Sequence, residues 1–327
     1  MLTAIAATIL VIGHRGSPGL RPEHALASYE LAIEQGADYI EPDVVMTKDH
    51  VLIARHENEI SGTTDVATKF PDRKKKAVVD GTEIEGWFAE DFTLKEIKTL
   101  RAKERLATRS HEYDGKFEIP TLKEVLDLAK ASGKKAGRTV GVYVETKHPS
   151  YHKSVGLPLE DQLLKELKAS GFDGADKPVF IQSFELGNLK EMRAKTKTKL
   201  IYLLDESHVR PADFVIAKDH RTYGDMTKPE NLRELAKTVY GIGPYKRMIL
   251  PESKEGTLEQ PTTLVADAHA AKLKVHPYTF RSDKEFLNKA YAGNPETEYL
   301  QFMKLGVDGV FSDFPNDAVK ARKAFLK

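Results

Sequence analysis

The feature that most constrains this chain is the alternation of short β-branched, apolar runs with longer amphipathic stretches. Such alternation is typical of parallel strands joined by helical crossovers. Strand-like runs occupy eight segments, at residues 9–13, 39–45, 140–146, 179–183, 200–204, 239–243, 274–278 and 309–313. Helical patterns occupy residues 23–35, 122–132, 159–170, 186–195, 229–237, 262–272 and 296–305. Eight strand–helix units predict an α/β fold of the TIM (β/α)8-barrel type.

The length of the chain agrees with that prediction. With 327 residues, 40% of them hydrophobic, it can bury the core of one large domain spanning residues 1–327. A doubly wound open sheet is the alternative, but such sheets usually have fewer strands. The sequence also contains nothing that resembles a dinucleotide-binding fingerprint.

One interval interrupts the regular spacing, since about ninety residues separate the second and third predicted barrel strands. Residues 51–56 read as a further strand that follows the turn at 48–50 and pairs as a hairpin near the barrel mouth. The remainder, about residues 57–118, is rich in Thr, Asp, Lys and Gly. It predicts a small insertion subdomain over the C-terminal face of the barrel.

The charge balance limits the choice of partner. Fifty basic and 49 acidic side chains leave a formal charge of +1, so no nucleic-acid partner is expected. The single basic run, residues 73–76, is interpreted as a solvated loop. The absence of cysteine excludes disulfides, thiolate nucleophiles and cysteine-ligated zinc.

The first twelve residues are uncharged and apolar. They lack a basic region and are shorter than the roughly 20 residues that cross a bilayer. We therefore expect no membrane insertion, and we interpret the segment as a short tail that runs into a buried strand.

Ionisable residues are dense where the predicted strands end, which is where a (β/α)8 barrel builds its active site. His14 and Arg15 follow the first strand, and His56 ends the hairpin. Glu41 and Asp43 lie two apart on the second strand and therefore project to the same face. Glu145 and Lys147 have the same spacing at the end of the third barrel strand.

The three carboxylates predict a cation site. Two carboxylates about 4 Å apart repel by roughly 4 kcal/mol at an effective dielectric of 20, so they need a shared proton or a cation. With Glu145 as a third oxygen ligand, the set suits Ca2+ or Mg2+ better than zinc. The alternative is that Glu41 and Asp43 are structural acids paired with Arg15 or Lys147.

The two histidines predict acid–base chemistry. Taken singly, His14 or His56 is more often a hydrogen-bonded core or rim residue, but at adjacent strand ends the two form a plausible general acid and base. Lys147 is placed to hold a phosphate oxygen, or else it forms a salt bridge to Glu41 or Asp43. No P-loop, nucleophile elbow, HExxH or EF-hand motif is present. The site instead combines carboxylates, paired histidines and basic side chains, and such a site is suited to phosphate-ester chemistry.

These residues lie in motifs that resemble the glycerophosphodiester phosphodiesterases. The opening motifs are VIGHRG at 11–16, RPEHAL at 21–26, ADYIEPD at 37–43, MTKD at 46–49 and LIARH at 52–56. Five further motifs resemble the bacterial periplasmic branch of the family: TDVA at 64–67, FPDR at 70–73, DFTLKEI at 91–97, HPYTFR at 276–281 and FSDFP at 311–315. The likeness runs from about residue 9 to about residue 318. The chain departs from the family pattern at two places. At Pro42, family members usually carry a residue with an amide hydrogen. Residues 204–226 match poorly, and this difference bears on which alcohol is preferred.

The resemblance implies metal-dependent hydrolysis of small glycerophosphodiesters to glycerol 3-phosphate and an alcohol. It implies a Ca2+ or Mg2+ ion on the three carboxylates and catalysis by the histidine pair. It also implies phosphate contacts from Arg15 and Lys147, and a pocket lined by Gln182, Phe184 and Tyr278. A periplasmic or secreted location is expected, with a cytoplasmic one as the alternative. The competing functions are a phospholipase-type phosphodiesterase acting on lipid and a non-catalytic binding or adhesion protein.

Overall fold

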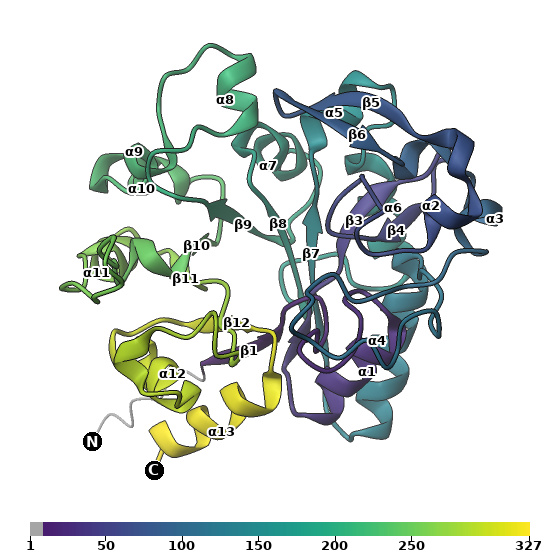
Figure 1. Cartoon of the computed structure of the whole chain (residues 1–327). Helices are drawn as coiled ribbons and strands as arrows, with labels where there is room; N and C mark the ends of the chain where they lie inside the picture. The colour runs from purple at the N-terminus through teal and green to yellow at the C-terminus, as the bar shows by residue number, and fades with distance from the viewer. Residues whose placement is uncertain (1–8) are drawn as a thin grey trace.

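Eight parallel strands form a nearly closed barrel in this computed structural model, which describes residues 9–327 (Figure 1). Neighbouring strands follow the order β11-β10-β9-β8-β7-β2-β1-β12. Contacts beyond β11 close the ring, because Phe280 bridges to Ser312 and Phe311 N–H donates to Pro277 O. The eight barrel strands are β1 (Leu10–Gly13), β2 (Tyr39–Ile40), β7 (Gly141–Thr146), β8 (Val179–Ser183), β9 (Lys199–Leu204), β10 (Gly241–Pro244), β11 (Lys274–Val275) and β12 (Gly309–Ser312).

The fold class is therefore confirmed, and each of the eight predicted runs overlaps a barrel strand. The prediction for the tail falls partly on residues 1–8, which lie outside the described residues. Ile9 is buried and leads into β1.

Alternate residues of the strands divide between two apolar clusters, as the pleat requires. One set fills the barrel interior, where the Tyr143 ring lies 4.7 Å from Phe180 and 4.9 Å from Phe311 between centroids. The other set, which includes Val142 and Val310, packs outward against the helices. The barrel is thus filled by side chains below the site.

The predicted helices correspond to α1 (Leu26–Glu34), α4 (Leu122–Lys135), α6 (Glu160–Ala169), α7 (Leu186–Arg193), α10 (Pro229–Leu235), α11 (Leu264–Ala270) and α12 (Pro295–Lys304). The most clearly bounded is α4, where Thr121 and Glu124 form a capping box. Helix α1 begins three residues later than predicted, because His24 has φ +58° and cannot continue a right-handed helix. Further helices that the pattern did not predict are α5 (Pro149–Ser154), α8 (Ala212–Ile216), α9 (Tyr223–Met226) and α13 (Pro315–Phe325).

The second predicted strand is divided at Pro42. Its first part, β2, pairs with β1 and β7, and its second part, β3 (Asp43–Met46), pairs with β7 and with β4 (Leu52–Ala54). Proline has no N–H to donate to the ladder, so a break at this position is expected. The antiparallel β3–β4 pair confirms the hairpin predicted for residues 51–56.

Residues 57–118 carry their own short elements and share an apolar cluster with Val45 of β3 and Ile53 of β4. The elements are α2 (Val66–Lys69), η1 (Pro71–Arg73), β5 (Lys75–Val79), β6 (Thr82–Gly86), η2 (Ala89–Asp91) and α3 (Leu94–Ile97). The β5–β6 hairpin lies beside α5 (Figure 1), where Val79 and Phe88 pack against Tyr151. This contact holds the hairpin against the segment that follows β7.

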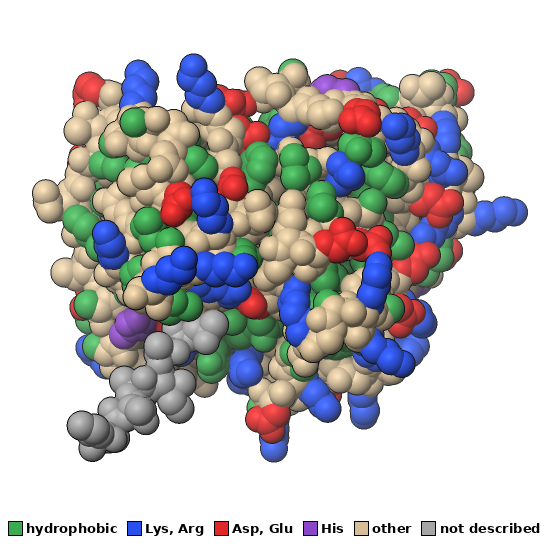
Figure 2. Space-filling model, turned by 90° about the horizontal axis from the view of Figure 1, so that it is seen from below, with side chains coloured by type: hydrophobic (Ala, Val, Ile, Leu, Met, Phe, Trp, Pro, Cys, Tyr) green, Lys and Arg blue, Asp and Glu red, His purple; other side chains and the backbone are tan. Residues whose placement is uncertain are grey.

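Each cation of the basic run 73–76 is paired with a carboxylate of the same segment. The pairs are Arg73–Glu96, Lys74–Glu85, Lys75–Asp91 and Lys76–Glu83. Because their side chains are about one-third to two-thirds exposed, these pairs contribute little to stability, but they neutralise the run. Figure 2 shows basic and acidic side chains interspersed with hydrophobic ones on the face seen from below. Within residues 9–327, no helix is long and apolar enough to cross a bilayer.

Candidate active site

The predicted site residues meet at the C-terminal ends of the barrel strands. A cavity of about 130 Å³ is lined by His14, Arg15, Glu41, His56, Glu145 and Gln182, together with Phe184, Tyr278 and Arg281. Asp43 and Lys147 lie directly beside these groups, as the distances below show. The fold therefore brings together all the positions that were predicted from separate strand ends.

Glu41, Asp43 and Glu145 form one buried cluster in which each offers an oxygen within 4.8 Å of the others. The register places Asp43 opposite Glu145 on β3 and β7. Burial, followed by repulsion from Asp43 and Glu145, raises the pKa of Glu41 well above its usual range. Burial also raises the pKa of Glu145 to about 7, although Lys147 opposes the rise. Mutual repulsion in a dry site thus makes three ionised carboxylates costly without a counterion.

The donor set of this cluster fits a hard divalent cation. Asp43 Oδ2 accepts a hydrogen bond from His24 Nε2 at 3.1 Å, whereas the buried Asp43 Oδ1 has no hydrogen-bond partner within residues 9–327. The Glu41 oxygens accept hydrogen bonds from Gln182 Nε2 at 2.6 Å and from the Arg15 N–H at 3.0 Å. These neighbours fix the orientation of the carboxylates and leave lone pairs directed at one another. All-oxygen ligation is what Ca2+ and Mg2+ prefer.

His14 is oriented by a carboxylate at the far end of the chain. Its Nδ1 lies 2.5 Å from Asp313 Oδ1, just beyond β12. Although burial raises the pKa of Asp313, the hydrogen bond from His14 and the charge of Arg109 hold that pKa well below its usual range, so the carboxylate is ionised. Nδ1 must then carry the proton, and Nε2, which lies 3.9 Å from Glu41 Oε2, presents a lone pair to the cavity. Burial and Arg15 lower the pKa of His14 to about 4, so it is neutral and able to accept a proton.

His56 belongs to a chain of polar contacts that leads outward. Its Nδ1 lies 2.7 Å from Glu57 Oε1, and the other Glu57 oxygen lies 2.9 Å from His148 Nε2. His148 Nδ1 contacts Asp80 at 2.6 Å, in the turn of the β5–β6 hairpin. Burial opposes protonation of His148, but these two carboxylates raise its pKa to about 9. The chain connects the cavity to the tip of the hairpin.

Arg15 and Lys147 place positive charge beside the carboxylates. Arg15 Nη1 lies 3.1 Å from Glu23 Oε2, and its Nε lies 3.6 Å from Asp43 Oδ2. Lys147 Nζ lies 2.9 Å from Glu145 Oε1 and 3.3 Å from His56 Nε2. The ion pair of Lys147 is thus made with Glu145, not with the Glu41 or Asp43 named as alternatives. Arg15 lines the cavity, and Lys147 lies behind Glu145 and His56 of its wall, so an anionic substrate can interact with both charges.

Several polar residues around the site were not assigned a role from the sequence. Asp313 ends a predicted strand, so the strand-end rule would have found it. Arg281 Nε, at 3.2 Å, and Arg109 Nη2, at 2.6 Å, both donate to Asp313. Arg109 comes from the 57–118 segment and also binds Asp283, a pairing that no local pattern could reveal. His24 was quoted in a motif, but its contact with Asp43 depends on the turn before α1.

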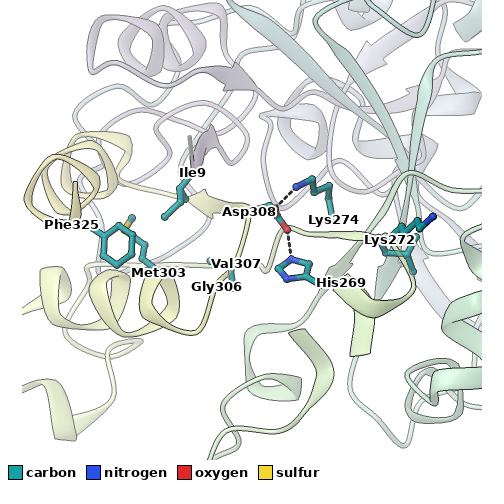
Figure 3. Close-up of a pocket in the computed structure, with 10 residues that line it drawn as sticks. Ile9, His269, Lys272, Lys274, Met303, Gly306, Val307, Asp308 and Phe325 are labelled. Carbon is teal, nitrogen blue, oxygen red and sulfur yellow. Dashed lines mark hydrogen bonds and ion pairs between the residues drawn. The ribbon is translucent and has the colours of Figure 1, made fainter. Parts of the chain in front are cut away.

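A larger cavity, about 620 Å³, lies at the opposite end of the barrel. It is bordered by Ile9, by the start of β11 and by Asp308, which precedes β12 (Figure 3). The Asp308 oxygens are held by His269 Nε2 at 2.8 Å and by Lys274 Nζ at 2.7 Å. Its lining includes one histidine and one carboxylate, which are bound to each other, so acid–base chemistry is assigned to the smaller cavity.

Comparison with known proteins finds relatives that match most of this chain. The model of the glycerophosphoryl diester phosphodiesterase family matches residues 14–317. A glycerophosphodiester phosphodiesterase of Arabidopsis thaliana is 39% identical over 93% of this chain and 83% of its own length. One from Haemophilus influenzae is 32% identical over 97% of this chain and 90% of its own length.

Solved structures agree in fold. A phosphodiesterase of Oleispira antarctica, solved with the product sn-glycerol-3-phosphate, superposes with a TM-score of 0.65 at 23% identity and covers 96% of each chain. A glycerophosphodiester phosphodiesterase of Agrobacterium tumefaciens gives a TM-score of 0.60 at 17% identity, covering 95% of this chain and 99% of its own. At these identities the likeness bears on the barrel alone.

Proposed function

The chain belongs to the glycerophosphoryl diester phosphodiesterase family, and from this premise we propose that it hydrolyses glycerophosphodiesters by divalent-cation-dependent, two-histidine catalysis. The products would be glycerol 3-phosphate and an alcohol. The observation that carries the proposal is that His14 and His56 line one cavity with Glu41 and Glu145 of the carboxylate cluster. The glycerophosphodiester phosphodiesterases of Arabidopsis and Haemophilus, at 39% and 32% identity, support the same substrate class.

Glu41, Asp43 and Glu145 would hold the cation, either Ca2+ or Mg2+. Bound there, it would supply positive charge that offsets the phosphodiester anion and the charge that builds up on it. Arg15 and Lys147 extend this positive region on the protein side. Gln182 keeps Glu41 oriented through its 2.6 Å hydrogen bond.

His14 is the better candidate for the general base. Its neutral ring, with Nδ1 bound to ionised Asp313, presents Nε2 to the cavity. We assign to Nε2 the removal of the proton from the 2-hydroxyl of the glycerol. That oxygen then attacks the adjacent phosphorus, an intramolecular step that benefits from a high effective concentration.

His56 would act as the general acid. Without substrate, burial and the charges of Arg15 and Lys147 lower the pKa of His56 well below its usual value, although Glu57 at Nδ1 opposes this. An anionic phosphodiester would offset those two positive charges and so favour the protonated form of His56. His56 then protonates the departing alcohol oxygen as the phosphorus–oxygen bond breaks, which leaves a glycerol 1,2-cyclic phosphate. In the second half, His56 removes a proton from water, the water opens the ring, and His14 returns its proton to the 2-oxygen.

The primary test is release of glycerol 3-phosphate from purified glycerophosphodiesters with and without added Ca2+ or Mg2+. We expect release that requires the cation, and little release of head group from intact phospholipid vesicles. Full activity after exhaustive chelation would contradict the cation assignment. Preferential action on vesicles would favour the phospholipase-type alternative.

A second test separates the cyclic route from direct attack by water. An analogue in which hydrogen replaces the 2-hydroxyl should bind but not turn over, because the internal nucleophile is missing. Brisk hydrolysis of that analogue would exclude the cyclic intermediate and leave the rest of the proposal standing.

A further inference from the structure

A second cavity, about 410 Å³, adjoins the catalytic one at the same end of the barrel. The two share His56, Glu145, Phe184 and Tyr278 in their walls. His14, the candidate base, lines only the smaller cavity, whereas the second cavity adds Lys147 to the shared His56. A diester whose phosphate lies at the shared wall therefore extends its glycerol toward His14 and its other alcohol into the second cavity.

Three aromatic rings form a corner of this second cavity. The Phe184 ring is nearly perpendicular to both tyrosines, at 89° and 5.9 Å from Tyr278 and at 77° and 6.2 Å from Tyr223. Both tyrosine hydroxyls donate to backbone carbonyls, Tyr278 to Leu204 O and Tyr223 to Phe184 O, each at 3.0 Å. With the hydroxyls engaged, what the two tyrosines offer a ligand is mainly ring surface, which attracts cations through the ring quadrupole. The Phe184 ring already has Lys147 Nζ 5.5 Å from its centre.

The acidic group available to a ligand in this cavity is Asp205, which directly follows β9. It is partly buried, and among residues 9–327 it forms no ion pair; its recorded contact is the N–H of Glu206 at 2.8 Å. The other acids of the lining are engaged. Asp80 is bound by His148, and Glu185 is bound by Ser150, with a pKa that burial raises to about 7. Of the basic side chains, Lys147 is paired with Glu145, His148 is paired with Asp80 and Glu57, and Arg210 is exposed to solvent.

We propose that this second cavity binds the alcohol part of the diester and selects alcohols that carry an alkylated ammonium group, as choline does. The inference rests on the proposed function of the catalytic cavity. Such a cation lacks N–H donors, so ring surface and one carboxylate satisfy it without further hydrogen bonds. Asp205 and Tyr223 both come from residues 204–226, the stretch that departs from the family pattern. Within it, α8 lies at the same end of the barrel as the β5–β6 hairpin (Figure 1).

The test compares kcat/KM for glycerophosphocholine with kcat/KM for glycerophosphoglycerol, whose alcohol is neutral. In the wild type we expect the choline diester to be favoured about tenfold, the size of a desolvated cation–aromatic contact plus a charge partner. Asp205→Asn should reduce this ratio several-fold, toward one. Glu206→Gln is the matched control, because it removes the same charge from the neighbouring residue, which does not line the cavity. It should leave the ratio unchanged.

The outcomes separate the inference from its premise. If neither diester releases glycerol 3-phosphate, the proposed function fails, and this inference fails with it. If both are turned over with kcat/KM values within about twofold, only the head-group assignment is wrong, whatever the variants do. A preference for glycerophosphoserine over glycerophosphocholine would also overturn it, since that head group would engage Arg210 together with Asp205.

Discussion

At the scale of single residues, the proposed mechanism depends on how each of the two histidine rings is held. His14 is held by Asp313, which in turn is bound by Arg109 and Arg281. His56 is held by Glu57. The first arrangement is buried and the second is partly open, so the two rings experience different environments. That difference is what an acid–base pair with opposite roles requires.

The histidines provide the most direct prediction. His14→Ala and His56→Ala should each lower kcat by about 10²-fold or more, because positioned acid–base groups typically contribute 10² to 10⁴. Steady-state kinetics with glycerophosphocholine would measure the loss, and circular dichroism would check that the fold is intact. A near-normal kcat in either variant would remove that histidine from the mechanism.

Substitution of Lys147 distinguishes its proposed phosphate contact from a purely structural salt bridge. Lys147→Ala should lower kcat/KM by about 10²-fold, because it removes a charge that faces the phosphate in the transition state. The effect on Tm should be small, since Glu145 is left with the other cation of the site, Arg15, nearby. A large fall in Tm with unchanged kinetics would show instead that the pair with Glu145 is structural.

How much of the site could be read from the sequence follows from where its residues lie. The strand-end rule located His14, Glu41 and Glu145, because parallel strands deliver their C-termini to one face. It could not locate Arg109, which comes from an irregular segment and reaches Asp313 across 204 positions of sequence. It also gave no sign of His148, whose contacts depend on where the β5–β6 hairpin packs.

At the scale of elements, the strands were predicted better than the helices that cap them. Each barrel strand is a short buried run, and such runs are visible as β-branched clusters. Short helices such as α5 and α9 contain one or two turns and lack a full amphipathic repeat, so their formation depends on tertiary packing. The division of the second strand could be anticipated from Pro42, but its place in the sheet could not.

The segment that directly follows β11 carries a buried histidine, His276, whose protonation should change stability. His276 is 1% exposed, accepts or donates a 2.9 Å hydrogen bond with Tyr143, and has its pKa lowered by burial to about 4. The unfolded chain binds a proton at this residue near pH 6.5, whereas the folded chain does not. The free energy of unfolding is therefore unaffected by this residue above pH 6.5. It decreases as the pH falls toward 4, by about 3 kcal/mol in total.

Urea unfolding between pH 7 and pH 4.5 would measure this dependence. His276→Gln should flatten the curve relative to the wild type, whatever its stability at pH 7. His208→Gln, which removes a largely exposed histidine, should keep the wild-type dependence. Parallel curves for the wild type and His276→Gln would show that the buried ring does not titrate as inferred.

At the scale of the whole molecule, the barrel supplies the frame, and residues 57–118 add contacts that complete the site. The composition and the strand count were sufficient to predict the barrel, since few folds accommodate eight strand–helix units. The paths of the long connections were not predictable, because their packing is set by side chains distant in sequence. The barrel alone does not indicate what each site residue does, and the family resemblance suggests those roles.

Cation binding should be visible as a property of the whole fold. A ligand that binds only the folded state stabilises it by about 2.7 kcal/mol when present at 100 times its Kd. Added Ca2+ or Mg2+ should therefore raise the Tm of the wild type. Glu41→Gln should lose most of this rise and, without the cation, should be no less stable than the wild type, because it relieves repulsion within the cluster. An unchanged wild-type Tm at saturating cation would contradict the assignment of the cluster.

The hydrogen bond between His14 and Asp313 spans 299 positions, so it joins the first strand of the barrel to the last. A ribosome makes β12 long after β1, and contacts so distant in sequence are slow to form. The proposed base at His14 is therefore without its partner until β12 joins β1. If His14 acts as proposed, the growing chain cannot cleave phosphodiesters before its barrel is closed.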